Sequence, residues 1–303
     1  GEAIRVCHCG RSNGRAWSDA PAGMLSASTP APNPLECAPL PLAAWLARRT
    51  PLLESGLSDE KLPALHEWDL ALRLISQCKA SFVADNVALL HRESLAGNFP
   101  CTAEYRAGLK QILSRHQALF KRHPKALALW SSELARISRA SPITNGAAER
   151  LPAPEQSFLQ SAASTRKQPL ISVVMPTHNR ARLLRRAIIS ILAQSYRNFE
   201  LIVVDDASTD NTAEIVRAFT DPRVRYIRLE KNRRAAAARN IGILEAKGEL
   251  IAFQDDDDIW LPQKLEIQEA ALSAAPASVG LNLCSHIQLN RAGLCYTGWQ
   301  FHF

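Results

Sequence analysis

From residue 169 onward, short apolar runs alternate with stretches whose apolar positions recur at helical spacing. The runs are bounded by Pro, Gly or paired Asp, which predicts buried strands. The predicted strands are residues 171–175, 201–204, 224–229, 250–253 and 279–284, and the predicted helices are residues 182–193, 211–219, 235–246 and one that opens at Pro262. Strands that alternate with helices predict an α/β fold with a doubly wound, mostly parallel sheet.

The first half of the chain has a different pattern. Apolar positions in residues 58–140 recur at helical spacing and predict a mainly helical region. Residues 1–57 are rich in Pro, Ala and Ser without periodicity, so we expect loose structure there. Residues 141–168 also lack periodicity and predict a linker. The predicted organisation is a mainly helical region (1–140), a linker (141–168) and an α/β unit (169–303).

Four consecutive aspartates, Asp255 to Asp258, follow the strand predicted at residues 250–253. Adjacent carboxylates repel one another, and burying them is costly unless a cation is present. A strand that ends in such a cluster indicates a site for a hard divalent metal of the kind that holds phosphates. A solvated acidic turn is the alternative, but the apolar residues on both sides of the cluster favour the metal.

Two more polar clusters follow predicted strands. The first holds Pro176 and Thr177, and the second holds Asp205 and Asp206. Ligands of doubly wound sheets bind outside the carboxyl ends of the strands, where all three clusters are expected. A carboxylate there suits a nucleobase imide or a ribose hydroxyl. Helix capping is the alternative, and it explains residues 208–210 but not the aspartate pair.

Arginines surround the start of the helix predicted at residues 235–246. Arg233, Arg234 and Arg239 lie on or just before it. A helix amino terminus with guanidinium groups suits a diphosphate, and a solvated basic face is the alternative. The arginines between residues 180 and 186 are expected on the surface.

Charge and composition narrow the choice of partners only in part. The formal charge of +7 and the pI of about 9.2 fit an anionic ligand, a nucleic acid or an acidic membrane surface. A low aromatic content argues against a base-stacking nucleic-acid module. Seven irregularly spaced cysteines favour a reducing compartment, the cytoplasm. No apolar run approaches the roughly 20 residues of a membrane span, which leaves peripheral membrane contact open.

Four ordered segments resemble the family 2 glycosyltransferases, which have the GT-A fold. They are Ile171-Ser-Val-Val-Met-Pro-Thr-His-Asn-Arg180, Phe199-Glu-Leu-Ile-Val-Val-Asp-Asp-Ala-Ser-Thr-Asp210, Ala238-Arg-Asn240 and Ala252-Phe-Gln-Asp-Asp-Asp-Asp-Ile-Trp-Leu-Pro-Gln-Lys-Leu265. The resemblance implies an inverting transferase that uses a nucleotide-diphosphate sugar, Mg or Mn, and a glycan, lipid-linked or protein acceptor. It implies that Pro176 and Asp206 line the nucleoside pocket. Asp255 to Asp257 would match the family's Asp-x-Asp element, with Asp257 as the direct metal ligand.

One position departs from the family pattern. The family usually has Gly two residues after the Asn that Asn232 matches, and this chain has Arg234 there. The resemblance therefore does not settle the shape of this loop.

The order of the segments also departs from the family. After the strand near Val279 the family continues into an acceptor-binding half that carries the general base, and residues 284–303 are too few for it. A looser resemblance to that half covers residues 35–95. It places Glu67 on the position of the base, which must lie within hydrogen-bond reach of the acceptor hydroxyl. The alternative for Glu67 is a first-turn acid that favours the helix dipole.

Two explanations follow from this order. Either the chain comes from a longer tandem protein, or its two halves dock as a circularly permuted domain. We hypothesise that residues 35–140 pack against residues 169–303 and place Glu67 near Asp257. A metal-dependent inverting sugar transferase is then the first interpretation. A nucleotide-sugar-binding module with little turnover is the second, and a nucleic-acid-binding protein, which we do not expect, is the third.

Overall fold

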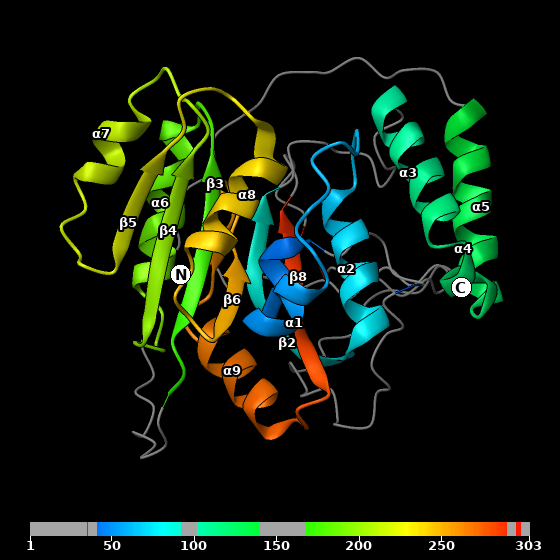
Figure 1. Ribbon diagram of the computed structural model, residues 1–303. Helices are drawn as coiled ribbons and strands as arrows, with labels where there is room; N and C mark the ends of the chain where they lie inside the picture. The colour runs from blue at the N-terminus through cyan, green and yellow to red at the C-terminus, as the bar shows by residue number, and fades with distance from the viewer. Residues whose placement is uncertain (1–34, 36–40, 92–101, 140–167, 290–294, 298–303) are drawn as a thin grey trace, which may run out of the picture.

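A computed structural model describes residues 35, 41–91, 102–139, 168–289 and 295–297 (Figure 1). The strands are β1 (Trp45–Arg48), β2 (Lys79–His91), β3 (Ile171–Thr177), β4 (Phe199–Asp205), β5 (Val224–Arg228), β6 (Leu250–Phe253), β7 (Ile259–Trp260), β8 (Val279–Leu289) and β9 (Cys295–Thr297). The helices are η1 (Leu42–Ala44), α1 (Arg49–Glu54), α2 (His66–Gln77), α3 (Ala103–Arg115), α4 (Gln117–Lys121), α5 (Pro124–Arg139), α6 (Ala181–Leu192), α7 (Thr212–Arg217), α8 (Arg234–Glu245) and α9 (Lys264–Ala274). The strands form one nine-stranded sheet, ordered β5-β4-β3-β6-β1-β8-β2-β7, with β9 paired to β8.

Four neighbouring strands of this sheet are parallel, as the sequence predicts. β3 pairs with β4 and β6, and β4 pairs with β5. Every residue of β3, β4 and β6 is buried, because α6 and α8 cover opposite faces of these strands (Figure 1). Burial on both faces explains why these strands are continuous apolar runs in the sequence. The predicted α/β class is confirmed.

Helix α8 lies unusually close to the sheet. A Cβ atom built on Gly242 would come within 2.3 Å of Cγ1 of Val174 in β3. The absence of a side chain at Gly242 therefore allows α8 to pack directly on β3. This contact brings the first turns of α8 close to the carboxyl ends of β3 and β4.

The N-terminal region contributes strands to the same sheet. β1 lies between β6 and β8 and runs antiparallel to both, with Leu46 opposite Ala252 and Asn282. β2 pairs in parallel with β8. The helices predicted for this region are present as α2 to α5, but the prediction of helix at residues 79–91 is wrong. Pairing with a long neighbouring strand outweighs the local preference of these residues.

The expected loose structure of residues 1–57 is wrong for residues 41–54. They form η1, β1 and α1, and residues 42–47 are almost fully buried. An apolar run, Leu42-Ala-Ala-Trp-Leu-Ala47, explains this, because its burial against β6 and β8 offsets the entropy lost on ordering. Most of the segment before residue 41, and residues 141–167 of the predicted linker, lie outside the described residues.

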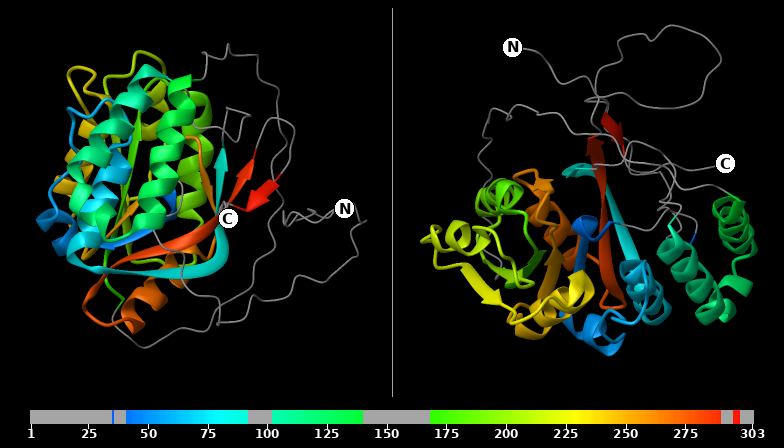
Figure 2. Two further views of the ribbon diagram at one scale, coloured as in Figure 1. Left: turned by 90° about the vertical axis from the view of Figure 1, so that its right-hand side faces the viewer. Right: turned by 90° about the horizontal axis from the view of Figure 1, so that it is seen from above.

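Helices α3 to α5 form a layer beside α2 (Figure 2). The ring of Trp68 in α2 packs against the rings of Phe120 and Trp130, with centroids 6.0 and 4.4 Å apart. Buried Asp69 binds Arg73, Arg115 and His116, which ties α2 to the end of α3. These contacts fix the helix that carries Glu67. No helix in the described part of the chain is both long enough and apolar enough to cross a membrane.

Candidate functional site

The three polar clusters meet at the carboxyl ends of β3, β4 and β6. The hydroxyl of Thr177 donates to Oδ2 of Asp256 at 2.7 Å, and the amide of Asp206 donates to the carbonyl of Thr177 at 2.9 Å. Thr177 is therefore the link between the aspartate pair after β4 and the aspartate row after β6. The arrangement follows from parallel strand pairing, which brings the ends of successive strands to one edge.

Asp205 and Asp206 have different environments. Asp205 is fully buried and accepts hydrogen bonds from the amide of Ser208 and the hydroxyl of Tyr226. Burial and the Asp205 carboxylate raise the pKa of Tyr226 to about 12. Asp206 accepts one hydrogen bond, from the amide of Arg233 at 2.7 Å, and its other oxygen has no partner among the described residues. Asp206 is therefore the better placed of the two to accept a hydrogen bond from a ligand.

Of residues 208–210, to which the capping alternative applies, Asp210 contacts the first turns of helices. Asp210 accepts hydrogen bonds from the amide of Thr212 in α7 and from the amide of Ala181 in α6. One carboxylate thus serves the first turns of two helices. Burial raises the pKa of Asp210, but the hydrogen bonds from the Thr212 hydroxyl and from these amides outweigh burial and lower the pKa below its usual value.

The aspartate row after β6 is not a solvated turn. The exposed fraction of the side chain is 36% for Asp255, 7% for Asp256 and 16% for Asp257. Burial raises the pKa of Asp256 to about 6 and also raises the pKa of Asp257, with the neighbouring aspartates adding to both effects. Carboxylates with raised pKa values lack sufficient positive charge around them, which favours binding of a cation.

Arg180, just before α6, and Arg186, within α6, supply part of the positive charge around the aspartate row. Nη1 of Arg180 lies 2.5 Å from Oδ2 of Asp257 and 3.3 Å from Oδ1 of Asp256, and Arg186 donates to the carbonyl of Asp257. Arg180 is about half exposed, as expected, yet it belongs to the site, which the sequence analysis missed. The available signal was its position at the turn between β3 and α6, beside the strand ends.

Arg239 connects the aspartate row to the N-terminal region. Its Nη1 lies 2.6 Å from Oε1 of Glu67, and its Nη2 lies 2.7 Å from Oδ1 of Asp255. The guanidinium is 8% exposed. Burial lowers the pKa of Arg239, but the two carboxylates outweigh this effect and raise it above its ordinary value. The structure thus brings Glu67, from the first turn of α2, to the same edge as the metal-type carboxylates.

The junction between the two regions has a second contact. The side-chain amide of Asn240 accepts a hydrogen bond from the amide of Ser58 and donates one to its carbonyl, both at 2.9 Å. Both residues are buried. Arg233 adds an exposed ion pair with Glu60. The turn that precedes α2 is therefore fixed to α8 by backbone-directed hydrogen bonds.

The loop before α8 contains the position at which the family pattern expects Gly. Arg234 has φ of 70°, in the left-handed region that favours Gly. The side-chain oxygen of Asn232 accepts a hydrogen bond from the Arg234 amide at 3.1 Å. The loop therefore adopts a backbone shape suited to Gly although the residue is Arg.

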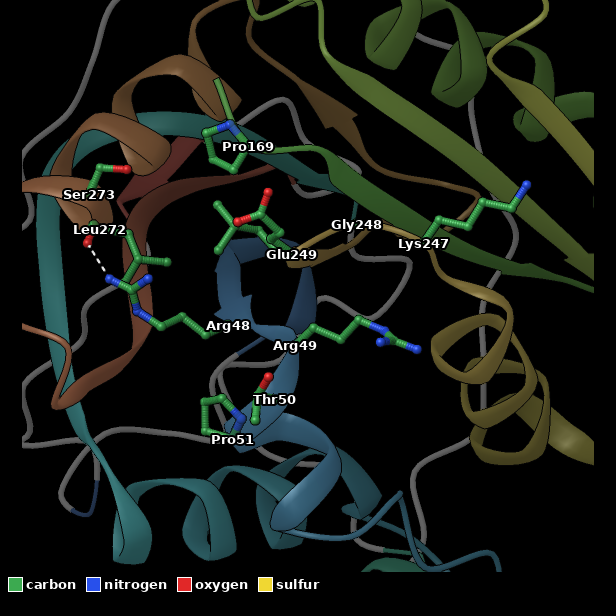
Figure 3. A pocket seen from close by; sticks show the side chains of 11 residues that line it. Arg48, Arg49, Thr50, Pro51, Pro169, Lys247, Gly248, Glu249, Leu272 and Ser273 are labelled. Carbon is green, nitrogen blue, oxygen red and sulfur yellow. Dashed lines mark hydrogen bonds between the residues drawn. The ribbon is translucent and has the colours of Figure 1, made fainter. Parts of the chain in front are cut away.

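A cavity of about 670 Å³ lies at the opposite edge of the sheet (Figure 3). Its lining includes Arg48 and Arg49 at the end of β1, and Gly248 and Glu249 before β6. Arg48 donates to the carbonyl of Leu272 across the cavity at 2.9 Å. None of the site residues predicted from the sequence lines this cavity, so the two features are separate.

The chain was compared with known protein families. Residues 172–287 match the model described as glycosyl transferase family 2. The match includes the ends of β3, β4 and β6, and therefore the aspartate pair and the aspartate row.

Curated relatives extend the similarity. A putative colanic acid biosynthesis glycosyl transferase, WcaA of Escherichia coli K12, is 47% identical over 104 residues, covering 34% of this chain and 37% of the relative. An uncharacterized glycosyltransferase of Rickettsia felis is 31% identical over 260 residues, covering 78% of this chain and 40% of the relative. The second match covers 78% of this chain, whereas residues 169–303 make up only 135 of its 303 residues. The second match therefore extends into the N-terminal region. The chain spans less than half of the length of each relative.

Two solved structures show partial similarity. One is S. aureus TarS 1-349 in complex with UDP, with 31% identity, a TM-score of 0.33, and coverage of 34% of this chain and 32% of that chain. The other is the mannosyltransferase PcManGT from Pyrobaculum calidifontis in complex with GDP-Man and Mn2+, with 32% identity, a TM-score of 0.33, and coverage of 36% and 34%.

We predict that Asp256→Asn stabilises the metal-free protein at neutral pH. The folded-state pKa of about 6 exceeds the ordinary value of 3.8, so between these values the folded protein holds a proton that the unfolded chain releases. The wild-type free energy of unfolding should therefore fall as pH rises from about 4 to 6, by up to about 2 kcal/mol, and the variant should lack this fall.

Urea unfolding at pH 4.5 and 7.5 with a chelator measures this effect. Asp221→Asn is the matched control, because Arg223 holds the pKa of Asp221 below its usual value, so that variant should lose stability at pH 7.5. Equal stability of Asp256→Asn and wild type at both pH values would contradict the prediction.

We also predict that Arg234→Gly raises the free energy of unfolding by about 1 kcal/mol, because a left-handed backbone costs a non-glycine residue about 1–2 kcal/mol. Arg233→Gly is the control, since Arg233 has φ of −120° and has no such strain to relieve. A loss of stability in Arg234→Gly as large as that of the control would refute the idea.

Proposed function

We propose that this chain, which belongs to glycosyltransferase family 2 through residues 172–287, transfers a sugar from a nucleotide-diphosphate sugar to an acceptor hydroxyl. The reaction is inverting and depends on a divalent metal. The observation that carries the proposal is the meeting of Asp206, the row Asp255 to Asp257, and Glu67 at one edge of the sheet. These residues supply a nucleoside contact, a metal site and a base.

The donor nucleoside binds at the ends of β3 and β4. Pro176 and Thr177 form the end of β3, and Asp206 offers a carboxylate oxygen without a partner among the described residues. Such an oxygen accepts a hydrogen bond from a base imide or a ribose hydroxyl. Asp205 supports this site indirectly, because its carboxylate holds the turn at Ser208.

The aspartate row fits a divalent metal. The carboxylates of Asp256 and Asp257 are largely buried and have raised pKa values, as expected for hard ligands that lack a full counter-charge. The described residues contain no set of three or more His, Cys, Asp or Glu side chains arranged as a metal cage. In this proposal Mg²⁺ or Mn²⁺ would be held through one or two carboxylates, with Asp257 as the direct ligand and donor phosphates as further ligands. When bound, the ion offsets charge that develops on the departing diphosphate.

Glu67 is the base in this proposal. One of its oxygens binds Arg239, and the other has no partner among the described residues. Its side chain is 29% exposed, so an acceptor hydroxyl can reach it. The free oxygen would remove the proton of that hydroxyl as the acceptor oxygen attacks the sugar. The acceptor is a glycan, a lipid-linked sugar or a protein, and we place the reaction in the cytoplasm.

A second function is a nucleotide-sugar-binding module with little turnover of its own. It is favoured by one observation, namely that the residues matched by the family model, 172–287, do not include Glu67. Calorimetry with UDP- and GDP-sugars in the presence of Mn²⁺, together with an assay of UDP or GDP release, separates the two. Binding with release supports the transferase, and binding without hydrolysis or transfer supports the module.

We predict that Asp257→Ala abolishes the Mn²⁺-dependent part of nucleotide binding, with a loss of affinity of about tenfold or more in Mn²⁺. Binding measured with a chelator should change little. Asp221→Ala, just before β5 and away from the site residues, is the control and should bind as wild type. Equal affinity of Asp257→Ala with and without Mn²⁺ is expected, and a metal effect as large as that of the wild type would disprove the assignment.

We predict that Glu67→Gln lowers donor turnover by about 10² to 10⁴-fold while nucleotide affinity stays within about twofold, since a general base acts on the chemical step. Glu104→Gln is the matched control, because Glu104 is also a first-turn acid, on α3. If both variants retain wild-type turnover, Glu67 acts only on the helix dipole.

A further inference from the structure

The buried guanidinium of Arg239 lies between one carboxylate from each chain region. Glu67 comes from α2 in the N-terminal region, and Asp255 follows β6 in the C-terminal half. We propose that Arg239 is a positioning residue that holds Glu67 in a fixed place beside the aspartate row. The inference rests on the proposed function for the role of Glu67, but the contact itself does not depend on it.

The geometry of the contact suits positioning. Arg239 uses a different nitrogen for each carboxylate, at 2.6 and 2.7 Å. A planar guanidinium can bind two carboxylates in a fixed relative orientation, whereas a Lys ammonium is a flexible point charge. Each carboxylate keeps its second oxygen without a partner in the described part of the structure. Arg239 therefore orients both groups and leaves one oxygen of each available.

Docking of the N-terminal region does not need Arg239. β1 is already paired with β6 and β8, and Asn240 holds Ser58 on α8. Arg73 also donates to three carbonyls of the turn before α2, those of residues 55–57. What these contacts leave undetermined is the position of the Glu67 side chain, which the ion pair fixes.

The position of Arg239 also carries an energetic disadvantage. Its Nε is buried and has no hydrogen-bond partner among the described residues. Buried polar atoms without partners are unfavourable, and such features concentrate at functional sites.

The test uses the full chain with Arg239→Met and Arg239→Lys. Arg225→Met is the matched control, because Arg225 also bridges two carboxylates, Glu200 and Glu245, but in the described structure it contacts no residue of the site. Three measurements are made: the NMR order parameter of the Glu67 side chain, calorimetric affinity for UDP and GDP with Mn²⁺, and donor turnover.

The order parameter of the Glu67 side chain should fall to about 0.6 or less in Arg239→Met and stay unchanged in the control. Nucleotide affinity should stay within about twofold, whereas turnover should fall about 10²-fold, since a small misplacement has an effect of this size. Arg239→Lys should recover part of the turnover. Combined with Glu67→Gln, Arg239→Met should add little further loss, because residues that act as a unit are not additive.

An unchanged order parameter of the Glu67 side chain would overturn the proposal. So would a parallel loss of nucleotide affinity and turnover, because that result identifies Arg239 as a donor contact. If Arg239→Met does not fold, Arg239→Lys and its cycle with Glu67→Gln decide the question. If the wild-type chain binds UDP or GDP but turns over no donor, the transferase proposal fails while the order parameter of Glu67 still tests the positioning.

Discussion

The site is organised by one electrostatic constraint: parallel strands bring several carboxylates to one edge of the sheet, where burial makes their charges unfavourable. Asp205, Asp206 and Asp256 are all nearly inaccessible to solvent. Hydrogen bonds and two arginines, Arg180 just before α6 and Arg239 in α8, offset part of the negative charge of these carboxylates. The raised pKa values of Asp256 and Asp257 show that this compensation is incomplete. An incompletely neutralised row of oxygens is the physical basis for proposing a metal.

The second organising feature is the shared sheet. β1 lies between β6 and β8, so the strand that leads to the aspartate row has neighbours from both regions of the chain. One apolar cluster includes Trp45 and Trp68 from the N-terminal region with Val174 and Phe253 from the C-terminal half. The edge-to-face contact of Trp45 and Phe253, with centroids 6.2 Å apart, lies in this cluster. Residues of both regions therefore share one apolar core.

Much of the C-terminal half could be predicted from local sequence. The apolar runs at β3, β4 and β6 are buried on both faces, and such runs give a strong signal. β2 could not be predicted in this way, because its strand conformation depends on pairing with β8, about 200 residues away. The ordered structure of residues 41–54 could not be predicted for the same reason, because β1 in this segment pairs with the distant strands β6 and β8.

Some residues of the site could likewise be predicted from local sequence, and others could not. The aspartates at strand ends were predictable, because strand ends of a parallel sheet coincide. The position of Glu67 came only from the resemblance to a family. The contacts of Arg180 and Arg239 depend on how α6 and α8 lie against the strands, which periodicity does not specify. The difference in environment between Asp205 and Asp206 depends on Tyr226, a residue of the neighbouring strand that donates a hydrogen bond to Asp205.

The placement of β1 has a kinetic consequence. Leu46 is paired with Ala252, a separation of 206 residues along the chain. On the ribosome, the first region emerges long before the strands that enclose β1 exist, so it must wait with Trp45 and Leu46 uncovered. Closing so long a loop adds little free energy, since each doubling of loop length costs only about 0.6 kcal/mol, but non-local pairing slows folding. Assembly of this sheet is therefore a late event, and the interval before it is when the nascent chain is most exposed to aggregation and to chaperones.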